Sequence, residues 1–179
     1  MPTYIAMLRG INVTGSKIIK MEALRASVAA LGFKNVRSYV QSGNLIFETQ
    51  SASPATLSAK IEQRILRDFG HNVPVFLRTP KEMTEIVKRN PFPKDPAVDQ
   101  SRRYVTFLDD VAPKTAAELL QPLAAGAEQI RVIGREIYLY CPNGYGETKI
   151  SNNAIEKKLS IGATTRNWRT TQTLLAMSQ

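Results

Sequence analysis

Apolar residues along the chain recur at two spacings, one typical of strands and one typical of helices. Short apolar runs such as "TYIAML", residues 3–8, predict strands. Met21, Leu24 and Val28 recur every three or four residues, which predicts an amphipathic helix. The first half is predicted to contain, in order, a strand (3–8), a helix (20–33), two strands (36–41 and 45–48), a helix (54–69), a strand (73–78) and a trailing helix. Ser42-Gly43-Asn44 is the predicted hairpin turn between the two consecutive strands. The capping box Thr79-Pro80-Lys81-Glu82 opens the trailing helix.

The stretch "RNPFPKDPAVDQSR" carries three prolines and interrupts this pattern, so it is the predicted linker, residues 91–101. The same order of elements then restarts. It consists of a strand (102–108), a helix from Pro113 to 123, two strands (128–133 and 136–141), a helix (153–159), a strand (163–166) and a last helix.

This element order predicts an α+β fold made of duplicated ferredoxin-like βαββαβ units, each followed by an extra helix. The first unit would span residues 1–90 and the second 102–179, and the two can form one compact domain. Several strands are apolar on both faces, so we expect the extra helices or the opposite half to cover the second face of each sheet.

Polar side chains follow the first two strands of the first unit. In a βαββαβ unit these strands run parallel, so their C-terminal ends lie at one edge of the sheet. The loop over residues 10–19 should therefore lie beside the hairpin over residues 41–44. The candidate ligand-binding residues at this edge are Arg9, Asn12, Lys17, Lys20, Gln41, Ser42 and Asn44.

A second polar edge is expected in the second unit, where "PNGYGETK" and "TTRNWRT" follow the third and fourth strands. The start of the last helix, near Trp168, would offer free N–H groups to an anion. Trp168 can instead anchor that helix in the core, with the arginines paired to surface carboxylates. The candidates here are Asn143, Lys149, Arg166, Asn167, Trp168 and Arg169.

The opening loop has part of the pattern of a phosphate-binding loop. Gly10 and Gly15 are correctly spaced, but Ser16 precedes Lys17 and Ile18 stands where the magnesium-binding hydroxyl belongs. The helix is also predicted to begin late, near residue 21. These departures argue against hydrolysis of a nucleoside triphosphate at this loop.

Composition narrows the function further. The chain has 179 residues, 43% of them hydrophobic, and a net charge of +9, which favours anionic partners or is simply a solvated surface. Residues 1–95 hold 14 Lys and Arg against 7 Asp and Glu. Apolar runs are too short for a membrane span and Met1 opens no signal peptide, so a cytoplasmic protein without membrane contact is expected.

Only one cysteine and one histidine are present. A disulfide within the chain is therefore impossible, and a metal site or a cofactor is not expected. His71 is predicted to lie in an exposed turn rather than in a catalytic group.

The segments "YIAMLRGINVTG…KIIKMEALR", "VRSYVQSGNLIFE" and "TTRNWRT" resemble the signatures of an uncharacterised, mainly bacterial family, domain of unknown function 1697. The resemblance runs from the first strand to the last helix and implies a compact α+β protein with ferredoxin-like halves. It implies no activity. Members of the family often carry a second glycine before Gly15 and a "G-R-S-K-L-S-N" stretch. Here Glu147 replaces the positive charge of that stretch, whereas Lys149, Ser151 and Asn152 fit it.

Three functions follow from these features. The first is a binding module for a phosphorylated small molecule, a nucleotide or RNA, held by one or both polar edges. The second is a transferase or hydrolase on a phosphorylated substrate, although no acid–base pair stands out. The third is a protein-interaction domain that uses an exposed strand edge. The sequence leaves the oligomeric state open.

Overall fold

The computed structural model describes residues 1–92 and 99–179 and divides the chain into two compact units. The first unit comprises Met1–Thr84 together with Thr173–Gln179, and the second comprises Glu85–Gln172. Each unit contains one four-stranded antiparallel sheet, so the predicted α+β class is confirmed. Part of the predicted linker, residues 93–98, lies outside the described residues.

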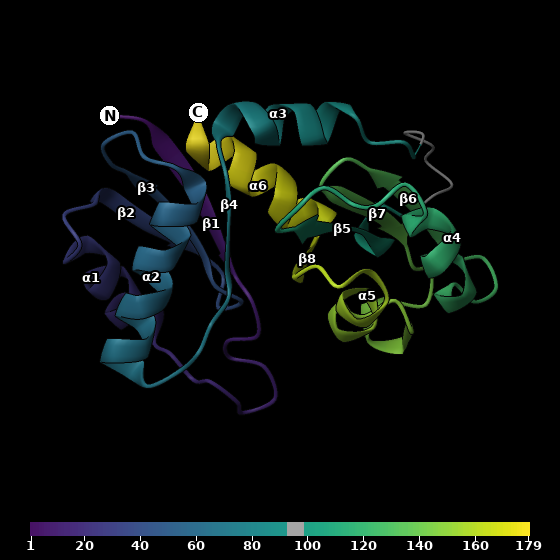
Figure 1. The fold of residues 1–179 in the computed structure, drawn as a ribbon, viewed down its shortest axis with the longest axis horizontal. Coiled ribbons are helices and arrows are strands. Elements are labelled where there is room, and N and C mark those ends of the chain that lie inside the picture. Colours follow the sequence, from purple (N-terminus) through teal and green to yellow (C-terminus); the bar gives the residue numbers. More distant parts are fainter. Residues whose placement is uncertain (93–98) are drawn as a thin grey trace. The chain divides into compact units, whose positions relative to one another are not determined.

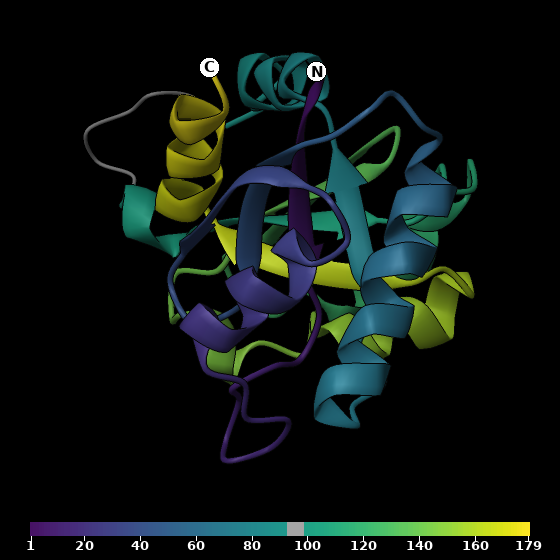
Figure 2. The same ribbon diagram turned by 90° about the vertical axis from the view of Figure 1, so that its left-hand side faces the viewer.

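The first sheet has the strand order β2-β3-β1-β4 (Figure 1), and β1 pairs antiparallel with both β3 and β4. Its two helices, α1 and α2, lie in front of the strands in the view of Figure 2. The elements of this unit are β1 (Thr3–Leu8), α1 (Met21–Ala29), β2 (Lys34–Tyr39), β3 (Asn44–Glu48), α2 (Pro54–Phe69) and β4 (Val75–Arg78).

The second sheet repeats this order as β6-β7-β5-β8. Its elements are β5 (Arg103–Leu108), α4 (Ala116–Leu120), β6 (Gln129–Ile133), β7 (Glu136–Tyr140), α5 (Asn152–Leu159) and β8 (Ala163–Asn167). Two further helices, α3 (Pro80–Lys88) and α6 (Trp168–Ser178), follow β4 and β8, and each crosses the boundary between the units along the chain. None of the described helices combines the length and the apolar composition needed to cross a bilayer.

The ends of α2 and α3 follow from local chemistry. Ser53 Oγ accepts a hydrogen bond from the Thr56 N–H at 3.2 Å, and Gly70 ends α2 in the left-handed conformation at φ 72°. The predicted capping box at α3 is present, because the Thr79 N–H donates to Glu82 Oε2 and the Glu82 N–H donates to Thr79 Oγ1.

The helix predicted from Pro113 to residue 123 is shorter than expected. Only Ala116–Leu120 is α-helical, and a single 3-10 turn, Gln121–Leu123, follows. Pro122 has no N–H to continue the ladder of α-helical hydrogen bonds, so the helix tightens and ends there.

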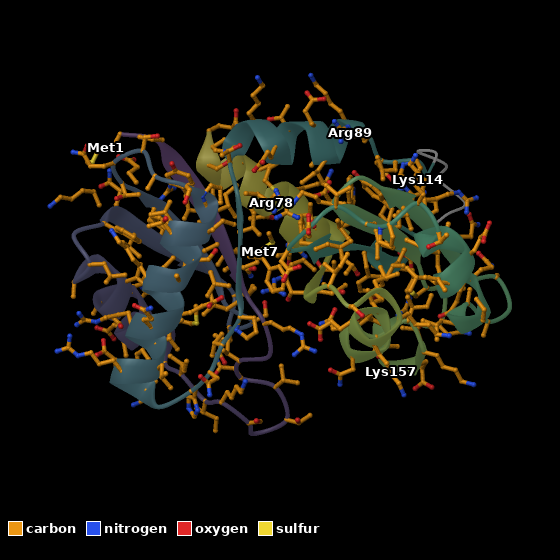
Figure 3. All side chains as sticks on the ribbon, viewed as in Figure 1. Met1, Met7, Arg78, Arg89, Lys114 and Lys157 are labelled. Atoms are coloured by element: carbon orange, nitrogen blue, oxygen red, sulfur yellow. The ribbon has the colours of Figure 1, made fainter. Side chains whose placement is uncertain are left out.

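Residues on both faces of each sheet are buried. In the first unit, Tyr4, Ala6 and Leu8 of β1 pack with residues of α1 and α2 in one core. The alternate residues point to the opposite face, where Met7 of β1 and Arg78 of β4 are also buried (Figure 3). The pattern of β1, apolar at every position from 4 to 8, is thus that of a strand covered on both sides.

The second unit has the same division of faces. Ile137 and Leu139 of β7 pack with α4 and α5 in a core that includes Leu120 and Ile155. On the other face, the Tyr138 hydroxyl donates to the Ile86 carbonyl at 2.6 Å, which places the end of α3 over this part of the sheet.

Candidate anion-binding site

The opening loop folds into a small hairpin of its own. Val13 and Ser16 form a bridge, and the Ser16 N–H donates to the Val13 carbonyl at 2.9 Å. Thr14 and Gly15 between them have φ 47° and 75°, the left-handed values that a type I′ turn requires. The hairpin extends beyond the strands of the first sheet (Figure 1, Figure 2).

This geometry differs from a phosphate-binding loop. Such a loop points its N–H groups at the phosphate and leads directly into a helix. Here the N–H groups of Asn12 and Ser16 bond within the loop, to the carbonyls of Lys17 and Val13, and α1 begins only at Met21. Both the late helix start and the departure from the phosphate-loop pattern agree with the prediction.

Asn12 joins the loop to the β2–β3 hairpin. Its Nδ2 donates to the carbonyls of Gln41 at 2.8 Å and Ile19 at 3.0 Å, and its Oδ1 accepts from the Ile19 N–H at 2.8 Å. Leu8 adds a backbone hydrogen bond to the Gly43 carbonyl at 2.8 Å. The two loops therefore lie side by side, as the strand directions predict, but the Asn12 amide is occupied in holding them together.

Gly43 is required where the two loops meet. Its φ is 91°, and a Cβ built there would lie 2.7 Å from Ile11 Cδ1 and 2.9 Å from Leu8 Cβ. A side chain at this position would be strained and would displace the opening loop.

We call the solvent-facing part of this region, residues 9–20 and 40–44, the loop edge. Its cations are Arg9, which is half-buried, Lys17 and the exposed Lys20. Lys17 Nζ donates to the Asn72 carbonyl at 2.5 Å, and the Arg9 N–H donates to the Pro74 carbonyl at 3.0 Å. These bonds fix the Lys17 ammonium and the backbone of Arg9 beside the start of β4.

The remaining candidates at the loop edge differ in exposure. Gln41 and Ser42 face solvent, together with the apolar side chains of Val13 and Ile18. Asn44 is buried, and its Nδ2 donates to the Tyr39 carbonyl at 2.9 Å and contacts Ser42 Oγ at 3.2 Å. Asn44 thus shapes the hairpin turn and has no solvent-facing amide.

Two pockets lie along α2 in the same unit. We name each pocket after one of its lining residues. The Leu66 pocket has a volume of about 360 Å³, and the Arg67 pocket has a volume of about 220 Å³. The Leu66 pocket is lined by Glu62, Gln63, Leu66, Asn72, Val73 and Pro74. The Arg67 pocket is lined by Leu31, Lys60, Gln63, Arg64 and Arg67.

Neither pocket was predicted from the sequence. Lys60, Arg64 and Arg67 are spaced by four and three residues, so they were visible as a cationic stripe on the predicted helix. The contribution of Leu31 and of residues 72–74, which precede β4, was not visible, because it depends on how α2 packs against its neighbours.

The second polar edge is assembled only in part. The Tyr145 hydroxyl lies 3.2 Å from Thr165 Oγ1, so the loop after β7 does lie beside β8, as predicted. The register places Arg166 opposite Val105, whereas Thr165 is opposite Thr106. Because neighbouring residues of a strand face opposite ways, Arg166 lies on the other face from Tyr145 and Thr165.

Arg166 and Trp168 are both built into the structure. Each is 7% exposed, and Arg166 Nη1 donates to Thr164 Oγ1 and to the Thr165 carbonyl, both at 2.9 Å. Burial lowers the pKa of Arg166 to about 10. Asn167 Oδ1 accepts from the Thr170 N–H at 2.8 Å and so caps α6. The helix start predicted as an anion site is therefore capped by its own side chain.

Asn143, Lys149, Asn167 and Arg169 are the exposed members of the second edge, and of these Asn167 is the one that caps α6. The second unit also contains a hydroxyl network that sequence reasoning missed. Thr165 Oγ1 lies 2.7 Å from both Asn152 Oδ1 and Thr106 Oγ1. Spacing along the chain gives no sign of this network, since Thr106, Asn152 and Thr165 come from three different elements, β5, α5 and β8.

Groups suited to covalent or metal chemistry are sparse in the described part of the chain. Cys141 is fully buried, and loss of hydration raises the pKa of its thiol to about 11, which disfavours the nucleophilic thiolate. His71 is half-buried in the loop between α2 and β4, not exposed as predicted. No group of three His, Cys, Asp or Glu residues is placed to hold a metal ion among residues 1–92 and 99–179.

Comparison with known proteins gives a family and a fold. No curated protein matches the chain. The conserved bacterial protein SP0830 from Streptococcus pneumoniae has a similar solved structure, with a TM-score of 0.76, 22% sequence identity and 99% of each chain covered. The model of a family described as "Protein of unknown function (DUF1697)" matches residues 1–138. The match ends before "TTRNWRT", so it is shorter than the resemblance seen in the sequence. The chain belongs to this family, DUF1697.

Proposed function

We propose that this protein is a binding module for phosphate-bearing ligands, nucleotides or RNA, and that the loop edge is its contact surface. The observation that carries the proposal is the Asn12 clamp, which joins two loops and holds Arg9, Lys17 and Lys20 at one end of the sheet. Organised cations on loops are the usual means of recognising phosphate.

The chemistry of the loop edge favours binding over catalysis. The cations come with exposed hydroxyl and amide groups from Ser42 and Gln41, which can donate hydrogen bonds to phosphate oxygens. The net charge of +9 adds a long-range attraction for anions. The buried, protonated thiol of Cys141 supplies no nucleophile.

The two units share one architecture. We infer that each unit is a ferredoxin-like βαββαβ unit and that the pair arose by duplication, because both sheets have the same strand order and the same antiparallel pairings. We retain residues 1–90 and 102–179 as the proposed unit boundaries. Asn143, Lys149 and Arg169 stay candidates for a contact surface in the second unit.

The test compares two double variants that remove the same charge. Lys17→Met/Lys20→Met alters the loop edge, and Lys157→Met/Lys158→Met removes two exposed lysines from α5. Fluorescence anisotropy would follow binding of a labelled nucleoside triphosphate and a labelled RNA 12-mer. Two exposed cation–phosphate contacts contribute about 1 kcal/mol together, so the loop variant should bind roughly fivefold more weakly.

The α5 variant should stay within about twofold of the unmodified protein, by the same estimate for charges outside the contact surface. Equal losses in both variants would show that attraction is set by net charge alone, and the loop edge would then not be the site. Failure of the unmodified protein to bind either probe would overturn the proposed function itself.

A further inference from the structure

The loop edge continues into the two pockets on α2. Lys17 Nζ donates to the Asn72 carbonyl, and the Arg9 N–H donates to the Pro74 carbonyl. Asn72 and Pro74 are lining residues of the Leu66 pocket. Gln63 lines both that pocket and the Arg67 pocket. The loop edge, the Leu66 pocket and the Arg67 pocket therefore adjoin in this order.

We propose that the ligand is a single strand of nucleic acid that runs from the loop edge, past the Leu66 pocket, to the Arg67 pocket. This inference rests on the proposed function and specifies its ligand class. A mononucleotide needs only one of these places, whereas a strand of several nucleotides occupies all three.

The far end of the track is suited to phosphate. Lys60, Arg64 and Arg67 line the Arg67 pocket. Asp68 pairs closely with one of these cations, because its Oδ2 accepts from Arg64 Nε at 2.7 Å and from the Ser27 hydroxyl at 2.6 Å, and the charge of Arg67 acts on it from further away. Lys60 and Arg67 form no ion pair with any described residue. Two of the three cations are thus available to a phosphate group.

The Leu66 pocket is suited to a base. Leu66 is 46% exposed, and with Val73 and Pro74 it gives the pocket an apolar wall. Glu62 Oε1 accepts from the Val75 N–H at 2.9 Å. A carboxylate has further lone pairs, so Glu62 can also accept from the exocyclic amino group of a base while Asn72 and Gln63 offer amides.

The alternation of cations, an apolar pocket and cations distinguishes a single strand from a duplex. A duplex turns its bases inward and offers mainly its backbone to a protein surface. Bases of a single strand are free to leave the stack and enter a pocket. The anionic Glu62 carboxylate between two cationic regions fits a base at that place and opposes a phosphate there.

The test measures how binding depends on salt and on ligand length. The double variant Lys60→Met/Arg67→Met removes two cations from the Arg67 pocket, and Lys157→Met/Lys158→Met is again the matched control. The plot of log K against log salt has a negative slope, and each lost phosphate contact to a single strand makes it less steep by about 0.7. The slope for the RNA 12-mer should therefore become less steep by about 1.4. The control should leave it unchanged.

Probe length separates this inference from the proposed function. We expect the Lys60→Met/Arg67→Met variant to lose affinity for the 12-mer and to bind the labelled nucleoside triphosphate as the unmodified protein does. An unchanged 12-mer slope, with binding still sensitive to Lys17→Met/Lys20→Met, would overturn the track and leave the loop edge intact. Stronger binding of a duplex 12-mer than of the single strand would also overturn it.

Discussion

The Asn12 side chain donates to the Gln41 carbonyl at 2.8 Å across 29 positions of sequence. This bond joins the loop after β1 to the loop after β2. The same amide also holds both backbone groups of Ile19, through its Oδ1 and its Nδ2. This side chain thus joins the two loops of the loop edge together with the backbone bond from Leu8 to Gly43.

Replacing Asn12 with alanine should destabilise the protein. The substitution removes three hydrogen bonds to backbone groups, two of them at Ile19, and places alanine at φ 55°. Unsatisfied groups and left-handed strain together predict a loss of about 2–4 kcal/mol in the free energy of unfolding, measured by urea denaturation. Asn143→Ala, at an exposed position, is the control and should change it by less than about 0.5 kcal/mol. Equal free energies of unfolding for the two variants would show that the Asn12 hydrogen bonds do not stabilise the fold.

Gly43→Ala tests the close approach of the two loops. The new Cβ would lie 2.7 Å from Ile11 Cδ1 at a residue with φ 91°. Overpacking and backbone strain predict a loss of about 2–4 kcal/mol in the free energy of unfolding.

Gly146→Ala is the matched control for this glycine, because its Cβ would meet no atom within 4 Å and its φ is not in the left-handed range. It should be neutral or slightly stabilising, by less than about 1 kcal/mol. Similar urea midpoints for Gly43→Ala and the unmodified protein would contradict this prediction, because the two loops would then accommodate the extra Cβ without loss of stability.

The spacing of apolar residues predicted α2 as residues 54–69, and the structure agrees to the residue. Ser53, Pro54 and Gly70 mark its two ends, and each acts through its immediate neighbours. Strand directions also predicted that the two loops of the first unit meet. The functional details failed where side chains contact distant backbone. The sequence predicts Asn12 as a ligand-binding residue, but its hydrogen bond to the Gln41 carbonyl is seen only in the folded chain.

Arg166 and Trp168 show a second limit of prediction. The topology correctly places their segment beside the loop after β7, yet the alternation of β8 turns Arg166 to the opposite face from Thr165. Trp168 is buried, in line with the alternative role of a core anchor. Two segments can therefore lie side by side while their side chains point to opposite faces of the sheet.

Cys141 should make stability depend on pH in the alkaline range. Burial raises the pKa of its thiol from the ordinary 9.0 to about 11. The folded state then keeps a proton that the unfolded state releases, so the stabilisation is present below about pH 9 and is lost as the pH rises towards 11. The loss is about 1.4 kcal/mol per pH unit within this window.

Urea denaturation at pH 8, 9 and 10 measures this dependence, with Cys141→Ala as the reference. The alanine variant is less stable at every pH but should lack this part of the slope. Reaction of the native thiol with a disulfide reagent at pH 8 should also be slow until the protein unfolds. A native thiol that reacts at the rate of the unfolded chain would contradict the burial.

Asp68→Asn should strengthen nucleic-acid binding. Asp68 is the carboxylate beside the Arg67 pocket, and hydrogen bonds from Ser27 and then Arg64 hold its pKa below the ordinary value, so it is ionised at pH 7. A phosphate about 7 Å from this charge is repelled even in a water-like dielectric, so removing the charge should raise the affinity roughly threefold. Glu118→Gln, on the exposed side of α4, removes the same charge in the other unit and should have no such effect. Anisotropy with the RNA 12-mer measures both, and weaker or equal binding by Asp68→Asn would place the strand away from α2.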